Sequence, residues 1–277
     1  VLAERALVVL RFGRDLARGS NGTDLRVAIG VQDLALQVLH RVVQNPALTP
    51  ELALRVAERL EAEHATPVDL SDTVRVDFLL TTASIWASIK PNAKILNEAP
   101  LLVAPGGPAW DPDAWEMPKV AGPVVSAYLK DQHFPTWAVL VDGMGVSYTN
   151  NKSLLERVSE EMSPDPDGGV RAELQGMVAN GLNSRIKGMQ RWNLDQGLIE
   201  SRVCLLATAA RTRVQQPGGS CAQDPMLGLD WGQDADAAGV LLWSPALEQI
   251  ELSRSQQNSL EIDVRFDQQA PPPAGAP

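Results

Sequence analysis

The stretch from Ile199 to Phe266 constrains the fold of this chain more than any other part. It begins with an apolar helical pattern that ends at about residue 213 and is followed by a Gly- and Ser-containing loop. Residues 260–266, LEIDVRF, alternate between apolar and charged side chains, which is the pattern of a half-buried β-strand. The predicted neighbours of this strand are residues 240–243 and 249–252.

Helical periodicity dominates the rest of the chain. The third predicted helix has the clearest start, because Thr49 can cap it, Pro50 fits its first turn and Glu51 complements its dipole. Thr23 is the predicted cap of the second helix, and Leu79 in the fourth is predicted to face the core. The predicted helices span residues 2–18, 23–44, 50–64, 71–89, 153–162 and 170–214, the last as one helix or two.

Residues 136–150 leave two interpretations open. Thr136 can cap a helix that begins with Trp137, whereas Asp142-Gly143 between apolar runs is a hairpin signal. The helical patterns on both sides favour the helix.

The predicted fold class is therefore mainly α, a multi-helix array with a small C-terminal antiparallel β-sheet. Residues 1–215 are predicted to form an α-helical domain with a Pro-rich loop at 90–118. Residues 216–267 form a small β element packed on the last helix, and residues 268–277 form a disordered Pro-rich tail.

Composition and charge disfavour two classes of partner. The chain has 277 residues, which is enough to bury a full core. Its net charge of −10 disfavours nucleic acid, whose phosphates require clustered Lys and Arg. No apolar run reaches the roughly 20 residues that a membrane span needs. Other proteins are the expected partners.

Cys204 and Cys221 also leave two interpretations open. In a reducing cytoplasm they are free thiols, whereas in an oxidising compartment they can bridge the end of a helix to the loop that follows it. The Gly-Gly-Ser loop before Cys221 lacks other anchors, which favours the disulfide. Closing a loop of this size stabilises a fold by roughly 3 kcal/mol.

Motifs that carry chemistry are absent from the sequence. His40, His64 and His133 do not have the spacing of zinc ligands, so no metal is predicted. No Gly-rich phosphate loop and no Gly-x-Ser-x-Gly occurs, so no cofactor and no catalytic residue is assigned. Carboxylates are abundant, but the sequence does not pair any two of them as acid and base.

Trp110 and Trp115 are the predicted binding residues. They lie within six residues of each other in a loop rich in Pro and Gly, so both cannot belong to one regular element. They either fold back onto the helices or anchor a partner, as exposed tryptophans do at interfaces. We take them as anchors of a partner-binding loop.

Short motifs at both ends of the chain suggest a resemblance. The helical part contains LALQVLH at 34–40 and LTPELA at 48–53, and the C-terminal part contains RVCLLATAAR at 202–211, DPMLG at 224–228 and VLLWS at 240–244. With these motifs the chain resembles bacterial envelope proteins that join a long α-helical region to a C-terminal element similar to type II secretion pseudopilins. Met226-Leu227 replaces the aromatic of the pseudopilin motif, and no acidic Gly-rich loop follows Ser244, so calcium binding is not carried over.

The resemblance implies a periplasmic or membrane-anchored setting in the cell envelope, with an N-terminal signal or anchor upstream of Val1 and outside this chain. The expected function is that of a non-enzymatic envelope protein that binds or scaffolds other proteins. The alternative is a hydrolase whose carboxylates converge only in the fold.

Overall fold

The computed structural model describes residues 1–89, 133–161, 169–216, 218–236 and 238–266. The helices are α1 (Leu2–Ala17), α2 (Gly22–Gln44), α3 (Pro50–His64), α4 (Leu70–Ile89), α8 (Phe134–Gly143), α9 (Tyr148–Glu161), α10 (Gly169–Arg213), α11 (Ala246–Gln249) and α12 (Arg254–Ser259). The strands are β1 (Gln223–Asp224), β2 (Leu229–Asp230), β3 (Gly232–Ala235), β4 (Gly239–Trp243) and β5 (Glu261–Arg265). The predicted fold class, mainly α with a small C-terminal antiparallel sheet, is confirmed.

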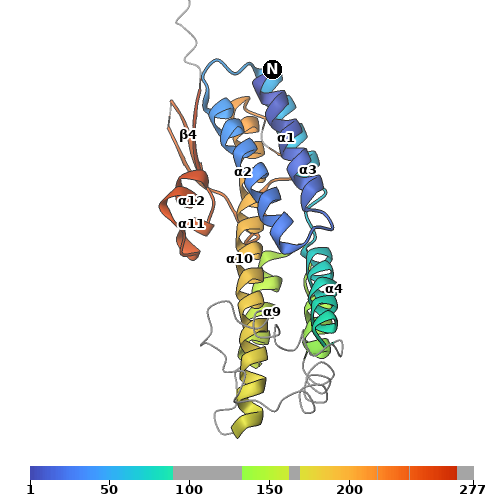
Figure 1. The fold of residues 1–277 in the computed structure, drawn as a ribbon. Helices are drawn as coiled ribbons and strands as arrows, with labels where there is room; N and C mark the ends of the chain where they lie inside the picture. Colours follow the sequence, from blue (N-terminus) through green and yellow to red (C-terminus); the bar gives the residue numbers. More distant parts are fainter. Residues whose placement is uncertain (90–132, 162–168, 217, 237, 267–277) are drawn as a thin grey trace, which may run out of the picture.

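Helix α10 is the common support of the fold (Figure 1). It has 45 residues and is therefore about 67 Å long. Helices α1, α2 and α3 form a group beside its C-terminal part, whereas α9 runs along its N-terminal part and α4 packs on α8 (Figure 1). Two groups of helices thus share one long helix.

Two of the predicted helix starts can be compared with the observed caps. The Thr49 side chain accepts from the amide of Leu52, as predicted, and Pro50 opens α3. The prediction of Thr23 as the cap of α2 is wrong, because Asn21 accepts from the amides of Thr23 and Asp24. Asn21 lies directly before α2, two residues ahead of Thr23. Its side-chain oxygen therefore reaches the first helix amides, which have no partner within the helix.

The two helix groups have separate cores. The first core joins α1, α2, α3 and the C-terminal part of α10 to the sheet. The second joins α4, α8, α9 and the middle of α10, and Ala17 of α1 and Leu25 and Ala28 of α2 also contribute to it. Leu79 does not contribute as predicted, because it is exposed on α4. Fully buried large residues of the two cores are Leu10, Leu36, Leu39, Leu60, Leu25, Trp137, Leu140, Leu155, Ile186 and Met189.

The sheet has the order β3–β4–β5 with antiparallel pairing throughout. Leu242 of β4 lies opposite Ile262 of β5, and both side chains join the first core together with Val264. The prediction of a strand at 249–252 is wrong. That segment follows the short helix α11, and β3, with the polar sequence GQDA, takes the place beside β4.

Asp224 connects the sheet region to α10. Its carboxylate is fully buried and accepts from the Ser201 hydroxyl at 2.7 Å and from the Met226 amide at 2.7 Å. The Ser244 hydroxyl, at the end of β4, donates to the other carboxylate oxygen. A buried carboxylate needs such donors, so the Asp224-Pro225 turn is held against α10 by this carboxylate.

Residues 136–150 are helical at both ends rather than a hairpin. Helix α8 begins at Phe134, ahead of the predicted cap Thr136, and ends at Gly143. A turn follows, and α9 begins at Tyr148. The Asp142-Gly143 pair therefore ends a helix instead of reversing a strand.

Cys204 and Cys221 form the predicted disulfide. It connects α10 to the loop before β1 and is buried in the first core. Within that loop Gly219 has a φ of 122°, and a Cβ there would lie 2.0 Å from Glu61 Oε1. Glycine is therefore required where the loop crosses α3.

His133 lies in an aromatic cluster at the start of α8. Its side chain is buried, with ring centroids 5.7–6.1 Å from those of Phe78, Phe134 and Trp137. Burial, with the nearby Arg185 guanidinium as a smaller cause, lowers the pKa of His133 to about 4. The imidazole is therefore neutral in the folded protein at neutral pH.

His133 predicts a loss of stability in acid. The unfolded chain binds a proton at His133 below about pH 6.5, whereas the folded protein does so only near pH 4. Stability contributed by the neutral form is full above pH 6.5 and falls as the pH drops toward 4, by up to about 1.4 kcal/mol per pH unit. Urea unfolding between pH 7 and 4 should show a flatter profile for His133→Gln than for the native chain. Parallel profiles would contradict this assignment.

Candidate functional site

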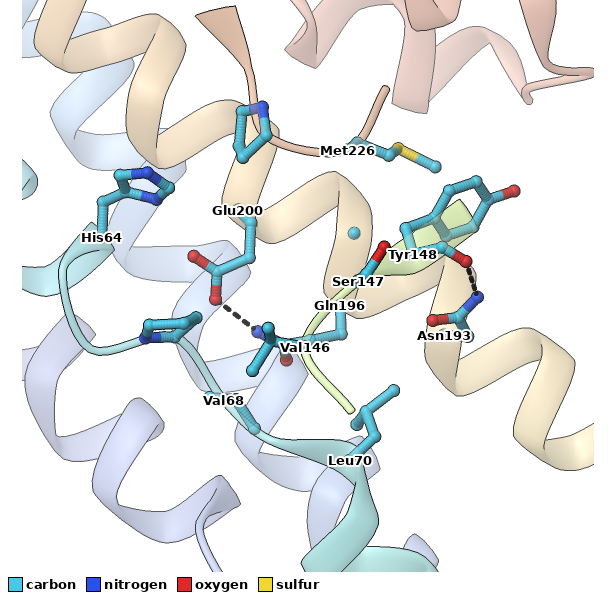
Figure 2. A pocket seen from close by; sticks show the side chains of 13 residues that line it. His64, Val68, Leu70, Val146, Ser147, Tyr148, Asn193, Gln196, Glu200 and Met226 are labelled. Carbon is cyan, nitrogen blue, oxygen red and sulfur yellow. Dashed lines mark hydrogen bonds between the residues drawn. The ribbon is translucent and has the colours of Figure 1, made fainter. Parts of the chain in front are cut away.

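A cavity of about 220 Å³ lies between the two helix groups. Figure 2 shows Glu200 and Gln196 on one wall, provided by α10, with Val68 and Leu70 of the α3–α4 segment below them. Val146, before α9, completes the lower wall. The remaining lining residues are His64, Pro67, Ser147, Tyr148, Asn193, Gly197, Pro225 and Met226.

Glu200 is the carboxylate that lines this cavity, and it is paired with a buried arginine. Arg14 of α1 has no exposed side-chain surface, and its Nη1 lies 3.0 Å from Glu200 Oε1. Its Nη2 donates to Glu200 Oε2 at 3.3 Å. A second carboxylate, Glu63, has an oxygen 3.5 Å from Arg14 Nε. The buried cation is therefore neutralised from two helices, which its burial requires.

Arg14 also caps α3. Its Nη2 donates to the backbone carbonyls of Glu63 at 2.9 Å and Thr66 at 3.1 Å. Arg18, one turn further along α1, donates to the same Thr66 carbonyl at 3.0 Å. The last carbonyls of a helix have no partner within the helix and carry its negative dipole end, so arginine is well suited there.

Gln196 leaves an unused acceptor beside the cavity. Its Nε2 donates to Glu200 Oε1 at 3.0 Å, because a carboxylate only accepts. The Gln196 carbonyl oxygen is buried and has no hydrogen-bond partner among the described residues. Water or a small ligand with an N–H or O–H group would satisfy it. Since Glu200 is held by Arg14, the cavity has the character of a small binding pocket.

A larger groove of about 790 Å³ lies on the other side of α10, between α2 and α12. Charged side chains line it in pairs: Arg202 contacts Asp33, and Arg191, next to the groove, lies 3.5 Å from Asp195. Other polar side chains of the lining come from α2 and α12: Gln37, His40, Arg41, Gln44, Ser255, Gln256, Asn258 and Ser259.

Two groups in this groove have shifted pKa values. Burial lowers the pKa of His40, and the Arg202 guanidinium lowers it further. Burial raises the pKa of Asp195 against the opposing effect of Arg191. His40 is therefore a neutral imidazole at neutral pH, able to donate one hydrogen bond and accept another.

The outer face of α1 carries apolar side chains into solvent. Val8 is 70% exposed and Phe12 is 60% exposed, and Val9 lies between them on the same face. Val1 and Leu2 extend this apolar face toward the start of the helix. Val8, Val9 and Phe12 lie on the side of α1 opposite the buried residues Leu7 and Leu10, and the exposed Arg5 lies one turn before them on the same side.

The site residues predicted from the sequence have different outcomes in the structure. Trp110 and Trp115 lie outside the described residues, so their role in binding stays a prediction. Cys204 and Cys221 are joined as predicted, and the fold brings His64 close to them. Arg14 was not among the predicted site residues. It lies one turn after Leu10 on the apolar face of α1, a position that indicates a buried cation.

No family model, no curated protein and no solved structure matches this chain. Function is therefore inferred from the geometry of the chain itself. None of the helices in the described ranges combines the length and apolar character that crossing a membrane requires.

Replacing Arg14 tests the buried ion pair. Arg14→Met leaves the Glu200 carboxylate buried without its cation, which should lower the free energy of unfolding by about 3–5 kcal/mol. Adding Glu200→Met removes that unpaired charge, so the double variant should be more stable than the sum of the two single changes implies. Urea unfolding of the four proteins measures this coupling.

Arg55→Met is the matched control, because Arg55 pairs with Glu4 on the surface at 3.3 Å. It should change stability by less than about 1 kcal/mol. Strictly additive effects of Arg14→Met and Glu200→Met would show that the pair has no structural role.

Proposed function

We propose that this chain is a non-enzymatic protein of the cell envelope that binds or scaffolds other proteins. The observation that carries the proposal is the apolar outer face of α1, formed by Val1, Leu2, Val8, Val9 and Phe12. Exposed apolar side chains gathered on one helix face are typical of protein interaction sites.

The occupant that fits this face is an amphipathic helix of a partner protein. A helix binds another through side chains at i, i+3, i+4 and i+7, which on α1 is the spacing of the exposed residues Arg5, Val8, Val9 and Phe12. Arg5 and Arg11 are exposed on the same side of α1. They favour a partner helix with acidic residues beside its apolar stripe.

The disulfide supports the envelope setting. Structural disulfides persist in oxidising compartments such as the periplasm and are rare in a reducing cytoplasm. The buried Asp224-Pro225 turn and strand β4, which ends at Trp243 just before Ser244, support the proposed resemblance to a pseudopilin-like C-terminal element. The proposed setting is therefore the periplasm or the membrane-anchored cell envelope.

The alternative function, a hydrolase, requires carboxylates that are free to act as acid and base. Glu200 in the cavity and Asp33 and Asp195 at the groove each lie against an arginine. These ion pairs occupy the three carboxylates and favour binding over hydrolysis. Asp195, with its raised pKa, is the carboxylate through which a hydrolase would act.

Site-specific photo-crosslinking tests the α1 surface. A photoreactive residue at Val8 or Phe12, in the full chain and its native cells, should crosslink the same partner protein, identified by mass spectrometry. A matched probe at Arg59, exposed on α3, should not. Val9→Asp should weaken binding by about 2 kcal/mol or more, which is roughly a thirtyfold loss of affinity, without changing the melting temperature.

Three outcomes would contradict the proposal. One is an equal yield from Arg59, and another is a yield that Val9→Asp does not change. The third is a crosslink only to a second copy of this chain, which would replace partner binding with self-association.

Thiol trapping tests the compartment. Cells are quenched in acid, and free thiols are alkylated before and after reduction. In the envelope, Cys204 and Cys221 should be alkylated only after reduction. Two alkylated thiols before reduction would place the chain in a reducing compartment and overturn the envelope proposal, while leaving partner binding through α1 to be judged separately.

A further inference from the structure

Three potential metal ligands from separate parts of the chain meet in the first core. An imidazole nitrogen of His64 and the sulfurs of Cys204 and Cys221 all lie within 4.8 Å of one another. His64 is at the end of α3, Cys204 is in α10, and Cys221 is in the loop before β1. Two thiolates and one imidazole are a ligand set that zinc prefers.

His64 has an unused ligand atom. Its Nδ1 is buried and has no hydrogen-bond partner among the described residues. Buried polar atoms of folded proteins are almost always paired, so the unpaired Nδ1 of His64 indicates a missing partner. Arg14 binds the Glu63 carbonyl next to His64 and so holds this end of the α3 backbone in place.

The framework around the sulfurs does not depend on the disulfide alone. The Cys221 carbonyl accepts from the Thr208 hydroxyl and from the Trp231 indole, both at 2.9 Å. Arg211 binds both carboxylate oxygens of Glu61, at 2.5 and 2.7 Å, and so joins α10 to α3 beside the loop. Cys221 therefore stays close to Cys204 and His64 when the sulfur–sulfur bond is broken.

We propose that the reduced chain binds one zinc ion through Cys204, Cys221 and His64, and that disulfide formation and zinc binding are alternative states of this site. A dithiol reductant gives two electrons and two protons to the disulfide and becomes a cyclic disulfide itself. Zinc then binds the two thiolates, and the two thiol protons pass to solvent. A small-molecule disulfide reverses the exchange: it accepts two electrons from the thiolates and is cleaved to two thiols, the Cys204–Cys221 bond forms again, and the metal is released.

Ligand spacing agrees with this site. Metal–ligand distances of about 2.0–2.3 Å in a tetrahedral site separate the ligand atoms by about 3.5 Å. Breaking the sulfur–sulfur bond lets the sulfurs move apart to that spacing, and the His64 nitrogen, now within 4.8 Å of them, has to approach by about 1.3 Å at most. His64 also lines the cavity of Figure 2, which provides a path for the ion and a fourth ligand from water.

Metal titration of the full chain tests the proposal. The protein is reduced with a phosphine, which becomes the phosphine oxide and does not compete as a thiol ligand. Reduced protein should bind one Zn²⁺ per chain, and Co²⁺ should give the near-ultraviolet absorption of thiolate ligation. Oxidised protein should bind neither. His64→Ala should weaken binding about tenfold or more, Cys204→Ser should abolish it, and His40→Ala should leave it unchanged.

The effect of Zn²⁺ on the reduced chain distinguishes a metal site from no site. If the reduced chain stays folded, Zn²⁺ should raise its melting temperature; if it unfolds, one equivalent of Zn²⁺ should restore helical circular dichroism. Less than one zinc per reduced chain, or equal affinity for His64→Ala and the native chain, would overturn the site. These results do not depend on partner binding through α1.

Discussion

The buried Arg14 guanidinium is the interaction on which the rest of the structure depends. It neutralises Glu200 on α10 and Glu63 on α3, and it satisfies the backbone carbonyls at the end of α3. A cation with no exposed surface is stable only when its partners are held in place, so α1, α3 and α10 fix one another through it. Gly13, the preceding residue, allows α1 to approach α2, since a Cβ there would lie 2.7 Å from Gln32 Cγ.

The position of α3 determines where two residues that line the cavity lie. It sets where His64 lies relative to the two cysteines and where the following segment, with Val68, closes the cavity wall. Inside the molecule the polar groups serve the structure. Arg14 neutralises the Glu200 carboxylate and donates to the Glu63 carbonyl at the end of α3. The outer face of α1 instead leaves Val8 and Phe12 in solvent, so one helix provides both the internal tie and the proposed binding surface.

Much of the fold could be predicted from local sequence. The Thr49-Pro50 start of α3, the alternation of β5 and the pairing of Cys204 with Cys221 each depend on neighbouring residues or on a short loop. Strand β3 could not be predicted, because GQDA has no apolar alternation and is held only by its backbone pairing with β4.

The candidate sites were harder to predict, because their residues are distant in sequence. Arg14 and Glu200 are 186 residues apart, and nothing near either residue indicates the other. His64 is distant in sequence from both cysteines, so nothing in the sequence indicated that the three residues could form one ligand set. A charged residue on an apolar helix face was the one available signal, and it identifies a buried ion pair without naming its partner.

Hydrogen exchange measured by mass spectrometry tests the central role of Arg14 most directly. In Arg14→Met, amides at the end of α3 and around Glu200 on α10 should exchange faster, because both segments lose their common partner. Amides of β4 and β5 should keep their native protection, since their pairing does not involve Arg14. Faster exchange confined to α1, with α3 and α10 unchanged, would show that Arg14 does not hold these helices together.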